Sequence, residues 1–201
     1  MCKIKRGSCR NYVFLVLFIL VPVQFVCAQN KDSEKFNVGL NFAFNSNNET
    51  LHNYWKPGVL YETYLKFPIN YGALQAGISY IPFKTKNSSQ PNFDGLFIYA
   101  QWDKKILSKD KLDLNAGFRF GLFRMIFEST PLYHTEDEMQ EHEIFAGIVT
   151  SLNYKLTDQL GIIFKLDYLS ILTRKKMNLV FVGSGFYYKF DTPQWLKNFL
   201  K

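Results

Sequence analysis

Two histidines and five carboxylates crowd into one segment of this chain, residues 134–143, and make it the clearest candidate for metal chemistry. Within it, His134, Glu138 and His142 recur at intervals of four residues. Imidazole and carboxylate groups are ligands for divalent cations, but this spacing aligns the three side chains only if the segment is helical. Because no metal-ligand motif is matched, we predict no metal site and interpret the segment as a solvated acidic loop.

A hydrolytic site would need a nucleophile within reach of a base, and two serines lie near histidines in the sequence. Ser46 precedes His52, and Ser129 precedes His134. Neither arrangement matches a catalytic motif, so the sequence predicts no catalytic residue and no cofactor.

Charged side chains also stand within an alternating apolar segment, residues 112–123. One face of this segment is apolar throughout, while the opposite face carries Asp113 and Arg119. A period of two is typical of a β-strand, because successive side chains point to opposite sides of the sheet. The segment is also about as long as a tilted strand that crosses a bilayer.

Seven further segments have the pattern of strands, although residues 96–102 are apolar on both faces, and together the eight segments predict eight antiparallel strands. The predicted strands are residues 36–44, 59–67, 73–82, 96–102, 112–123, 144–154, 160–169 and 178–190. Longer polar loops follow the first, third and fifth strands, at residues 45–56, 83–94 and 128–143, and a polar turn spans residues 103–111. This pattern predicts an all-β fold, an eight-stranded transmembrane β-barrel in an up-and-down meander.

The polar face of the predicted strands favours a membrane barrel over a soluble one. It carries small and hydrogen-bonding residues and charges of both signs, namely Asn37, Asn41, Glu62, Lys66, Gln75, Gly77, Asp113, Gly117, Arg119, Ser151, Asn153, Lys165 and Asp167. A narrow lumen can satisfy such groups, whereas a charge that faces hydrocarbon is costly. We therefore expect the polar face to line the lumen and the apolar face to contact lipid. Aromatic residues near strand ends predict interfacial belts: Phe36, Phe67, Tyr80, Trp102, Tyr154, Tyr168 and Tyr187.

Within this lumen, we expect the charges to form ion pairs. The predicted pairs join Arg119 to Glu62 or Asp113, and Lys165 to Asp167. A lumen this narrow favours a structural network that holds the barrel in shape, and the alternative is a path for protons or ions.

The two ends of the chain are predicted to lie outside the barrel domain, which spans residues 29–190. Residues 1–28 have the basic start, apolar stretch and small-residue cleavage site of a secretory signal peptide. A permanent anchor and a lipoprotein acylated at Cys27 are the alternatives. Residues 191–201 predict a short amphipathic helix in the periplasm, because apolar residues recur at helical spacing, namely Trp195, Leu196, Phe199 and Leu200.

Cleavage of this leader would change what the composition implies. Four of the 24 Lys and Arg residues lie in the leader, against 17 Asp and Glu residues in the rest of the chain, so the net charge would fall from +7 to +3. The basic balance then gives little support to a nucleic-acid partner, and we expect none. All three cysteines also lie in the leader, so the mature chain would have neither disulfide nor thiol chemistry.

The alternating strands, the loop pattern and the polar lumen face resemble those of the small eight-stranded OmpX/OmpA-type outer-membrane β-barrels. The resemblance implies a porin-like barrel in the outer membrane of a Gram-negative bacterium, with its lumen filled by side chains. The predicted function is a structural or interaction role in the cell envelope. The alternatives are a lipid-modifying enzyme of the lipid A deacylase or acyltransferase kind, and a small channel. The His-x-Ser pair expected of the deacylases is absent from the sequence.

The expected partners are outer-membrane lipid and lipopolysaccharide, together with envelope proteins that meet the outer loops or the C-terminal tail. Six basic residues near the predicted outer rim could bind lipopolysaccharide phosphates, namely Lys84, Lys86, Arg124, Arg174, Lys175 and Lys176. The acidic loop beyond residues 112–123 is where we expect a specific protein partner.

Overall fold

The computed structural model describes residues 35–69, 71–87, 90–128, 140–172 and 177–193, and most of them lie in β-strands. The elements are β1 (Lys35–Asn45), the 3-10 helix η3 (Thr50–Asn53), β2 (Trp55–Pro57), β3 (Val59–Ile69), β4 (Gly72–Thr85), β5 (Phe93–Lys109), β6 (Leu112–Phe127), β7 (Gln140–Lys155), β8 (Leu160–Ile171) and β9 (Met177–Asp191). No helix within these ranges is long and apolar enough to span a membrane.

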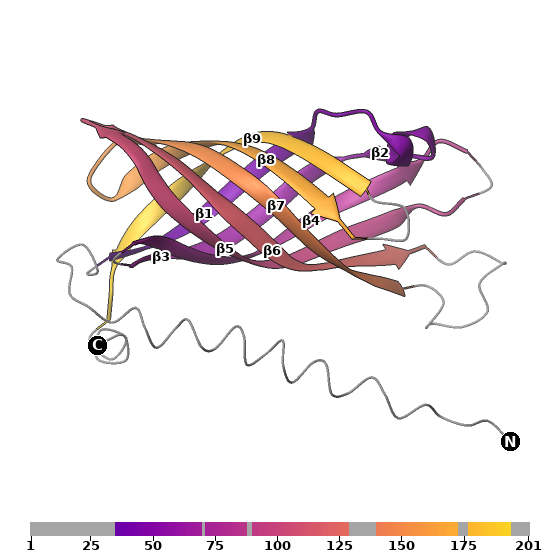
Figure 1. Ribbon diagram of the computed structural model, residues 1–201, viewed down its shortest axis with the longest axis horizontal. Helices are drawn as coiled ribbons and strands as arrows, with labels where there is room; N and C mark the ends of the chain where they lie inside the picture. The colour runs from indigo at the N-terminus through magenta and orange to yellow at the C-terminus, as the bar shows by residue number, and fades with distance from the viewer. Residues whose placement is uncertain (1–34, 70, 88–89, 129–139, 173–176, 194–201) are drawn as a thin grey trace, which may run out of the picture.

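The strands close on themselves into an antiparallel barrel, as predicted (Figure 1). β1 pairs with β3 on one side and with β9 on the other, and the pairing of β4 with β5 completes the ring. The short strand β2 pairs only with the end of β4. Gly58 separates β2 from β3 and donates its N–H to the Pro82 carbonyl at 2.7 Å. β2 and β3 therefore form one interrupted strand, and the barrel has eight staves.

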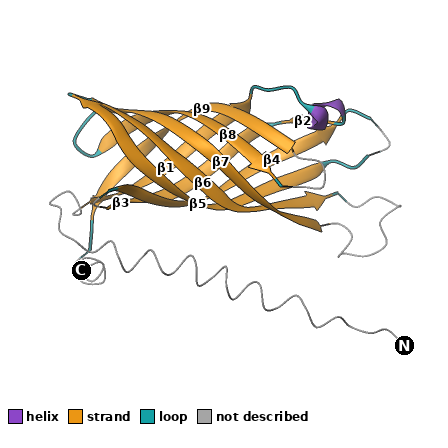
Figure 2. Ribbon diagram, in the orientation of Figure 1, coloured by secondary structure: helices purple, strands orange, loops and turns teal. Residues whose placement is uncertain are grey.

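The connections define two different ends of the barrel (Figure 2). Short turns join β3 to β4, β5 to β6 and β7 to β8 at the end where β1 begins and β9 ends, which we name the turn end. β1, β4, β6 and β8 end at the opposite end of the barrel, where η3 also lies, and we name it the loop end.

At the turn end, the predicted polar turn at residues 103–111 was wrong. β5 continues to Lys109, and only Asp110 and Lys111 close the hairpin with β6. Pairing with β6 keeps the end of β5 in the sheet, while a register shift between Lys105 and Leu107 interrupts the alternation that the prediction relied on. Asp110 adopts a φ of 47°, a left-handed conformation that aspartate tolerates.

At the loop end, three predicted loops were too long. β4 continues to Thr85, β5 begins at Phe93, and β7 begins at Gln140. The loop predicted at residues 45–56 contains η3 and β2. These polar extensions do not show the apolar alternation of the belt, and pairing between long strands holds them in the sheet.

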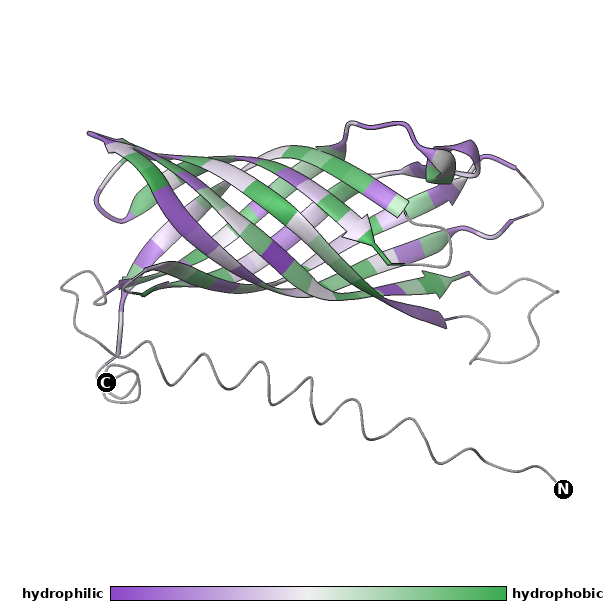
Figure 3. Cartoon of the chain, viewed as in Figure 1, coloured by the Kyte–Doolittle hydropathy of each residue, from purple (hydrophilic) through white to green (hydrophobic). Residues whose placement is uncertain are grey.

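The predicted strand faces are confirmed. On β6, Phe118 and Phe120 are 60% and 48% exposed, whereas Arg119 between them is 2% exposed. The same alternation of hydrophobic and hydrophilic residues runs along the strands of the barrel wall (Figure 3). The pleat therefore gives the barrel an apolar outer belt and turns the polar face inward.

Three inward-facing tyrosines each lie opposite a glycine of the neighbouring strand, in the pairs Tyr64–Gly39, Tyr99–Gly77 and Tyr187–Gly161. A Cβ atom on Gly39 would lie 2.1 Å from the Tyr64 ring, so glycine leaves the space that the ring fills. Tyr187 is buried in the lumen, and its predicted place in an interfacial belt was therefore wrong.

Two predicted segments lie outside the described residues. They are the signal peptide, residues 1–28, and the C-terminal helix, of which residues 194–201 are not described. Of the predicted tail, Asp191 is the last residue of β9.

Candidate functional site

The lumen holds a cluster of four buried charges, two acidic and two basic. Glu62 lies on β3, Arg119 on β6, and Lys165 and Asp167 on β8, and each is at most 8% exposed. We name this set the ion cluster. Alternation turns each side chain inward, and closure of the barrel brings the four together. Because the two signs balance, the cluster places no net charge in the lumen.

Glu62 is the centre of the ion cluster. Its carboxylate lies 2.7 Å from Arg119 Nη2 and accepts hydrogen bonds from Lys165 Nζ at 2.6 and 2.9 Å. It also accepts hydrogen bonds from the Tyr99 hydroxyl at 2.6 Å and from the Asn41 amide at 2.5 Å. Hydrogen bonds to an ionised group are the stronger kind, so one carboxylate joins β1, β5, β6 and β8 to β3.

Arg119 extends the polar contacts toward the turn end. Its Nη1 lies 3.1 Å from Asp167 Oδ2, and its guanidinium carbon lies 3.9 Å from the centroid of the Tyr99 ring. Its Nε donates to Gln101 Oε1 at 2.8 Å, and the Gln101 amide donates to Asp103 at 2.8 Å. The Arg119 guanidinium therefore contacts an amide, a carboxylate and an aromatic ring at once, as its planar set of donors allows.

The predicted ion pairs are confirmed in two cases, Arg119 with Glu62 and Lys165 with Asp167 at 3.5 Å. The alternative prediction, that Arg119 pairs with Asp113, was wrong. Asp113 lies closer to the turn end and pairs with Lys155 at 3.0 Å and with Lys105 at 3.7 Å. Both acids share the inward face, so only the register around the barrel distinguishes them.

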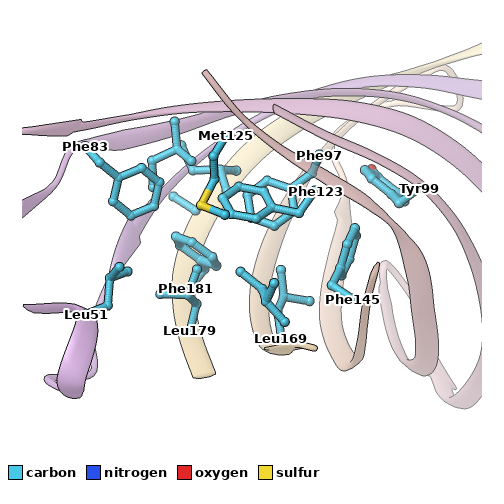
Figure 4. Close-up of a cluster of buried hydrophobic side chains, with 14 of the residues drawn as sticks. Leu51, Phe83, Phe97, Tyr99, Phe123, Met125, Phe145, Leu169, Leu179 and Phe181 are labelled. Carbon is cyan, nitrogen blue, oxygen red and sulfur yellow. The ribbon is translucent and has the colours of Figure 1, made fainter. Parts of the chain in front are cut away.

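Beyond the ion cluster, the lumen is filled with apolar side chains (Figure 4). Phe97 stacks on Phe123 with ring centroids 4.3 Å apart, and Phe83 stacks on Phe93 at 4.4 Å. We name this set the aromatic plug, and its members include Ile81, Phe83, Phe93, Phe97, Phe123, Met125, Phe145, Leu169, Ile171, Leu179 and Phe181.

The aromatic plug corrects the prediction of a polar lumen. That prediction holds around the ion cluster and fails toward the loop end, where inward residues such as Phe97 and Phe123 are each 1% exposed. Alternation assigns residues to faces, but where both faces are apolar it does not distinguish lumen from lipid. The apolar residues on both faces of β5 were the available signal.

The segment between β1 and β2 packs against the aromatic plug at the loop end. Leu51 of η3 is 6% exposed and packs against the plug. Asn47 accepts a hydrogen bond from the Val180 N–H and donates one to the Asn178 carbonyl, both at 2.8 Å. Lys86 Nζ donates to the His52 carbonyl at 2.5 Å. This segment, residues 46–54, is a cap attached to β9 and to the chain that follows β4.

Hydrogen bonds hold His52 of the cap by both ring nitrogens. Nδ1 accepts from the Glu49 backbone N–H at 2.9 Å, and Nε2 lies 2.6 Å from Asn45 Oδ1. Because a backbone N–H can only donate, Nδ1 carries no proton and Nε2 is the donor. Desolvation by burial lowers the pKa of His52, which favours this neutral form. His52 therefore has a structural role in the cap.

Among the residues that the structure describes, the other candidates for catalysis or metal binding are not brought together. The Ser46 hydroxyl faces the Val180 carbonyl at 3.4 Å and makes no hydrogen bond to His52. His142 is exposed on β7, in register with Arg124. His134, Glu138 and Ser129 lie outside the described residues. The described ranges contain no group of three side chains that could hold a metal ion.

Some basic residues at the loop end donate hydrogen bonds to protein groups, and others are exposed. Lys84 is exposed on the outward face of β4, opposite Lys56 of β2, which the sequence did not single out. Arg124 donates from Nη2 to Gln140 Oε1, and Lys86 is engaged in the cap. The predicted rim residues 174–176 lie outside the described ranges.

We expect Arg119→Met to lower the free energy of unfolding by about 3–5 kcal/mol, because two buried carboxylates would share one remaining cation. Adding Asp167→Asn restores neutrality and should recover part of the loss. Urea unfolding followed by tryptophan fluorescence checks both variants, with the exposed Lys109→Met as control. A double variant no more stable than Arg119→Met would contradict the charge-balance explanation.

The lowered pKa of His52 predicts that the cap weakens in acid. The open cap binds a proton more readily than the closed one, so closure is most stable above about pH 6.5 and weakens as the pH falls below it. The hydrogen-exchange protection factor of the Glu49 amide should therefore decrease over this range. His52→Asn, which keeps an acceptor that does not titrate, should remove the dependence. An unchanged dependence in that variant would exclude His52 as its source.

The fold is similar to solved structures of small outer-membrane barrels. Neisserial surface protein A matches with a TM-score of 0.57 and 16% identity, over 77% of this chain and 97% of that chain. OprH of Pseudomonas aeruginosa matches with a TM-score of 0.51 and 16% identity, over 78% and 99%. Ail of Yersinia pestis, in complex with the heparin analogue sucrose octasulfate, matches with 0.51 and 10%, over 79% and 99%.

Neither a protein-family model nor a curated protein sequence matches the chain. Similarity at these low identities establishes the fold. Eight antiparallel staves, short turns at one end and a lumen filled with side chains give this chain the fold of the small, OmpX/OmpA-type outer-membrane β-barrels.

Proposed function

We propose that this chain is a non-conducting β-barrel of the bacterial outer membrane with a structural or interaction role in the cell envelope. The filled lumen is the observation that supports this proposal most. A solute would have to displace Phe97 and Phe123 from the aromatic plug and then separate Glu62 from its cations. Both steps disrupt close packing or buried ion pairs, so the lumen is a poor path for solutes.

The outer belt supports the membrane location. Apolar side chains are more than half exposed on β1, β6, β7, β8 and β9, for example Leu40, Phe118, Ile148, Phe164 and Phe186. A continuous apolar surface of this kind is a liability in water, whereas hydrocarbon is its favourable environment. The similarity to solved outer-membrane barrels supports the same location.

The loop end supports interaction more than lipid chemistry. The aromatic plug fills the lumen at this end, and the cap packs against the plug through Leu51. Ser46 and His52, which are close in sequence, make hydrogen bonds to other groups and form no nucleophile–base pair. A packed end without this pair suits the recognition of a partner.

The filled lumen predicts that the purified full chain produces no ion conductance in a planar lipid bilayer. The physical reason is that the ion cluster and the aromatic plug close the lumen at two levels. Heat-modifiable migration on a gel shows that the inserted protein is folded. Discrete conductance steps from the folded barrel would contradict the proposal and favour the small-channel alternative.

Lipopolysaccharide is the partner whose chemistry fits the loop end. Lys56 and Lys84 are register partners on the outward face, and neither has an ion-pair partner among the described residues. Like charges placed directly opposite one another destabilise a sheet, and a phosphate between them would remove the repulsion. The structure of Ail with a heparin analogue offers a parallel for a polyanion on this fold.

We expect Lys56→Gln and Lys84→Gln each to weaken binding of purified lipopolysaccharide about fivefold, the effect of removing one cation near an anionic surface. Surface plasmon resonance on the detergent-solubilised full chain measures this binding. Lys109→Gln removes the same charge at the turn end and serves as the control. Equal losses in all three variants would mean that the lysine pair is not a specific site.

A further inference from the structure

A hollow at the turn end combines aromatic and basic side chains on the outside of the barrel. It has a volume of about 340 Å³ and is lined by Tyr71, Gly72, Trp102, Lys104 and Lys105. Gly72 has a φ of +146°, and a Cβ atom there would lie 2.1 Å from the Asp103 carbonyl oxygen. Glycine therefore allows β4 to begin close against β5, beside the Trp102 indole.

The hollow presents hydrogen-bond donors without protein acceptors. Within the described ranges, the Trp102 indole N–H has no hydrogen-bond partner, and no carboxylate lies within 4 Å of the Lys104 ammonium. The Lys105 ammonium is 3.7 Å from Asp113 and is therefore partly neutralised. An indole N–H and an ammonium that remain available in one hollow select an oxygen-rich anion.

The hollow lies beside exposed apolar residues of the outer belt, toward the turn end. Trp102 is in register with Leu74 of β4 and with Phe118 of β6, and both of these side chains are exposed on the belt. Two residues further along β5, Lys104 lies one residue past the last pair between β4 and β5, and exposed Ile106 and Leu107 follow it. In Figure 1, the β5–β6 hairpin extends to the end of the barrel at which β1 begins. An amphipathic aromatic residue followed by a lysine is the arrangement expected at the level of lipid headgroups.

We propose that this hollow binds the phosphate of an anionic phospholipid in the leaflet at the turn end. The Trp102 N–H and the Lys104 ammonium donate to the phosphate oxygens, Tyr71 flanks the headgroup, and the acyl chains lie along Leu74 and Phe118. The site rests on the proposed membrane location. It is distinct from the lysine pair at the loop end, which faces the opposite leaflet.

A protein strand is a poorer occupant of the same region. The end of β5 beyond β4 has a free edge, but the irregularity between Lys105 and Leu107 breaks its regular hydrogen-bonding geometry. Lysines at 104, 105 and 109 also place charge along it. Bulges and lysines are the features that block strand addition at an edge, which leaves the hollow itself to a small anionic group.

Native mass spectrometry of the full chain in detergent micelles, titrated with phosphatidylglycerol, tests the site. We expect Lys104→Gln and Trp102→Phe each to weaken phosphatidylglycerol binding about fivefold, since each removes one donor and keeps the bulk of the side chain. Lys109→Gln removes the same charge outside the hollow and should bind as the unsubstituted chain does. Lys105→Gln should have a smaller effect, because Asp113 already shares that charge.

Two further ligands identify the source of the phosphate. Diacylglycerol with the same acyl chains should not compete, and inorganic phosphate at the same concentration should compete weakly. Competition by inorganic phosphate as strong as that by the lipid would assign the hollow to a free anion and overturn the proposal. Equal binding by Lys104→Gln, Trp102→Phe and the Lys109→Gln control would also overturn it. Heat-modifiable migration on a gel tests the membrane barrel separately. If the chain were not a membrane barrel, no variant would show a folded, heat-modifiable form.

Discussion

The rest of the barrel depends on the carboxylate of Glu62, which must find its cations across the lumen. Its partners are 21 to 103 residues away in the chain and lie on β1, β5, β6 and β8. An unpaired carboxylate would be very costly in this position, because the surroundings exclude water. A slip of β3 by one residue would turn Glu62 into the outer belt. A register that separates Glu62 from these cations therefore has a higher free energy than the observed one.

The ion cluster and the aromatic plug divide the lumen between two kinds of interaction. Charge pairing is directional and selects which strands and registers are compatible, but burial of ions contributes little net stability. The aromatic plug supplies apolar burial and close ring contacts, such as Phe97 on Phe123. The lumen thus contains a hydrophobic core of the ordinary kind, although the barrel also has an apolar outer surface. This filled core gives the cap an apolar surface to pack against at the loop end.

The two ends of the barrel carry basic residues in different settings. At the loop end, Lys56 and Lys84 face each other across the short β2–β4 pair. At the turn end, Lys104 follows Trp102 and lies one residue past the last pair between β4 and β5. One group of cations therefore lies in a paired part of the sheet, whereas the other lies where pairing with the neighbouring strand stops.

Local alternation was enough to predict the number of staves, their order and, within the predicted strands, which residues share a face. Alternation is a local property with a period of two, so Phe118, Arg119 and Phe120 could be assigned to faces without knowledge of any other strand. The inward direction of the charged face also followed from the cost of placing a charge in lipid. These properties depend on neighbours one or two residues away, which a sequence displays directly.

Which residues meet across the lumen depends on strand pairing and ring closure. Arg119 had two possible acidic partners on the inward face, and the stagger of β3 and β6 around the ring selected Glu62 over Asp113. Phe97 lies in a stretch whose two faces are both apolar, and closure of the ring placed it in the core against Phe123. Pairing likewise extended β5 through a polar segment that alternation did not mark as strand. All three results have one cause. Contacts across the lumen and between paired strands join residues that are far apart in the chain, and no local sequence pattern encodes the register of the strands.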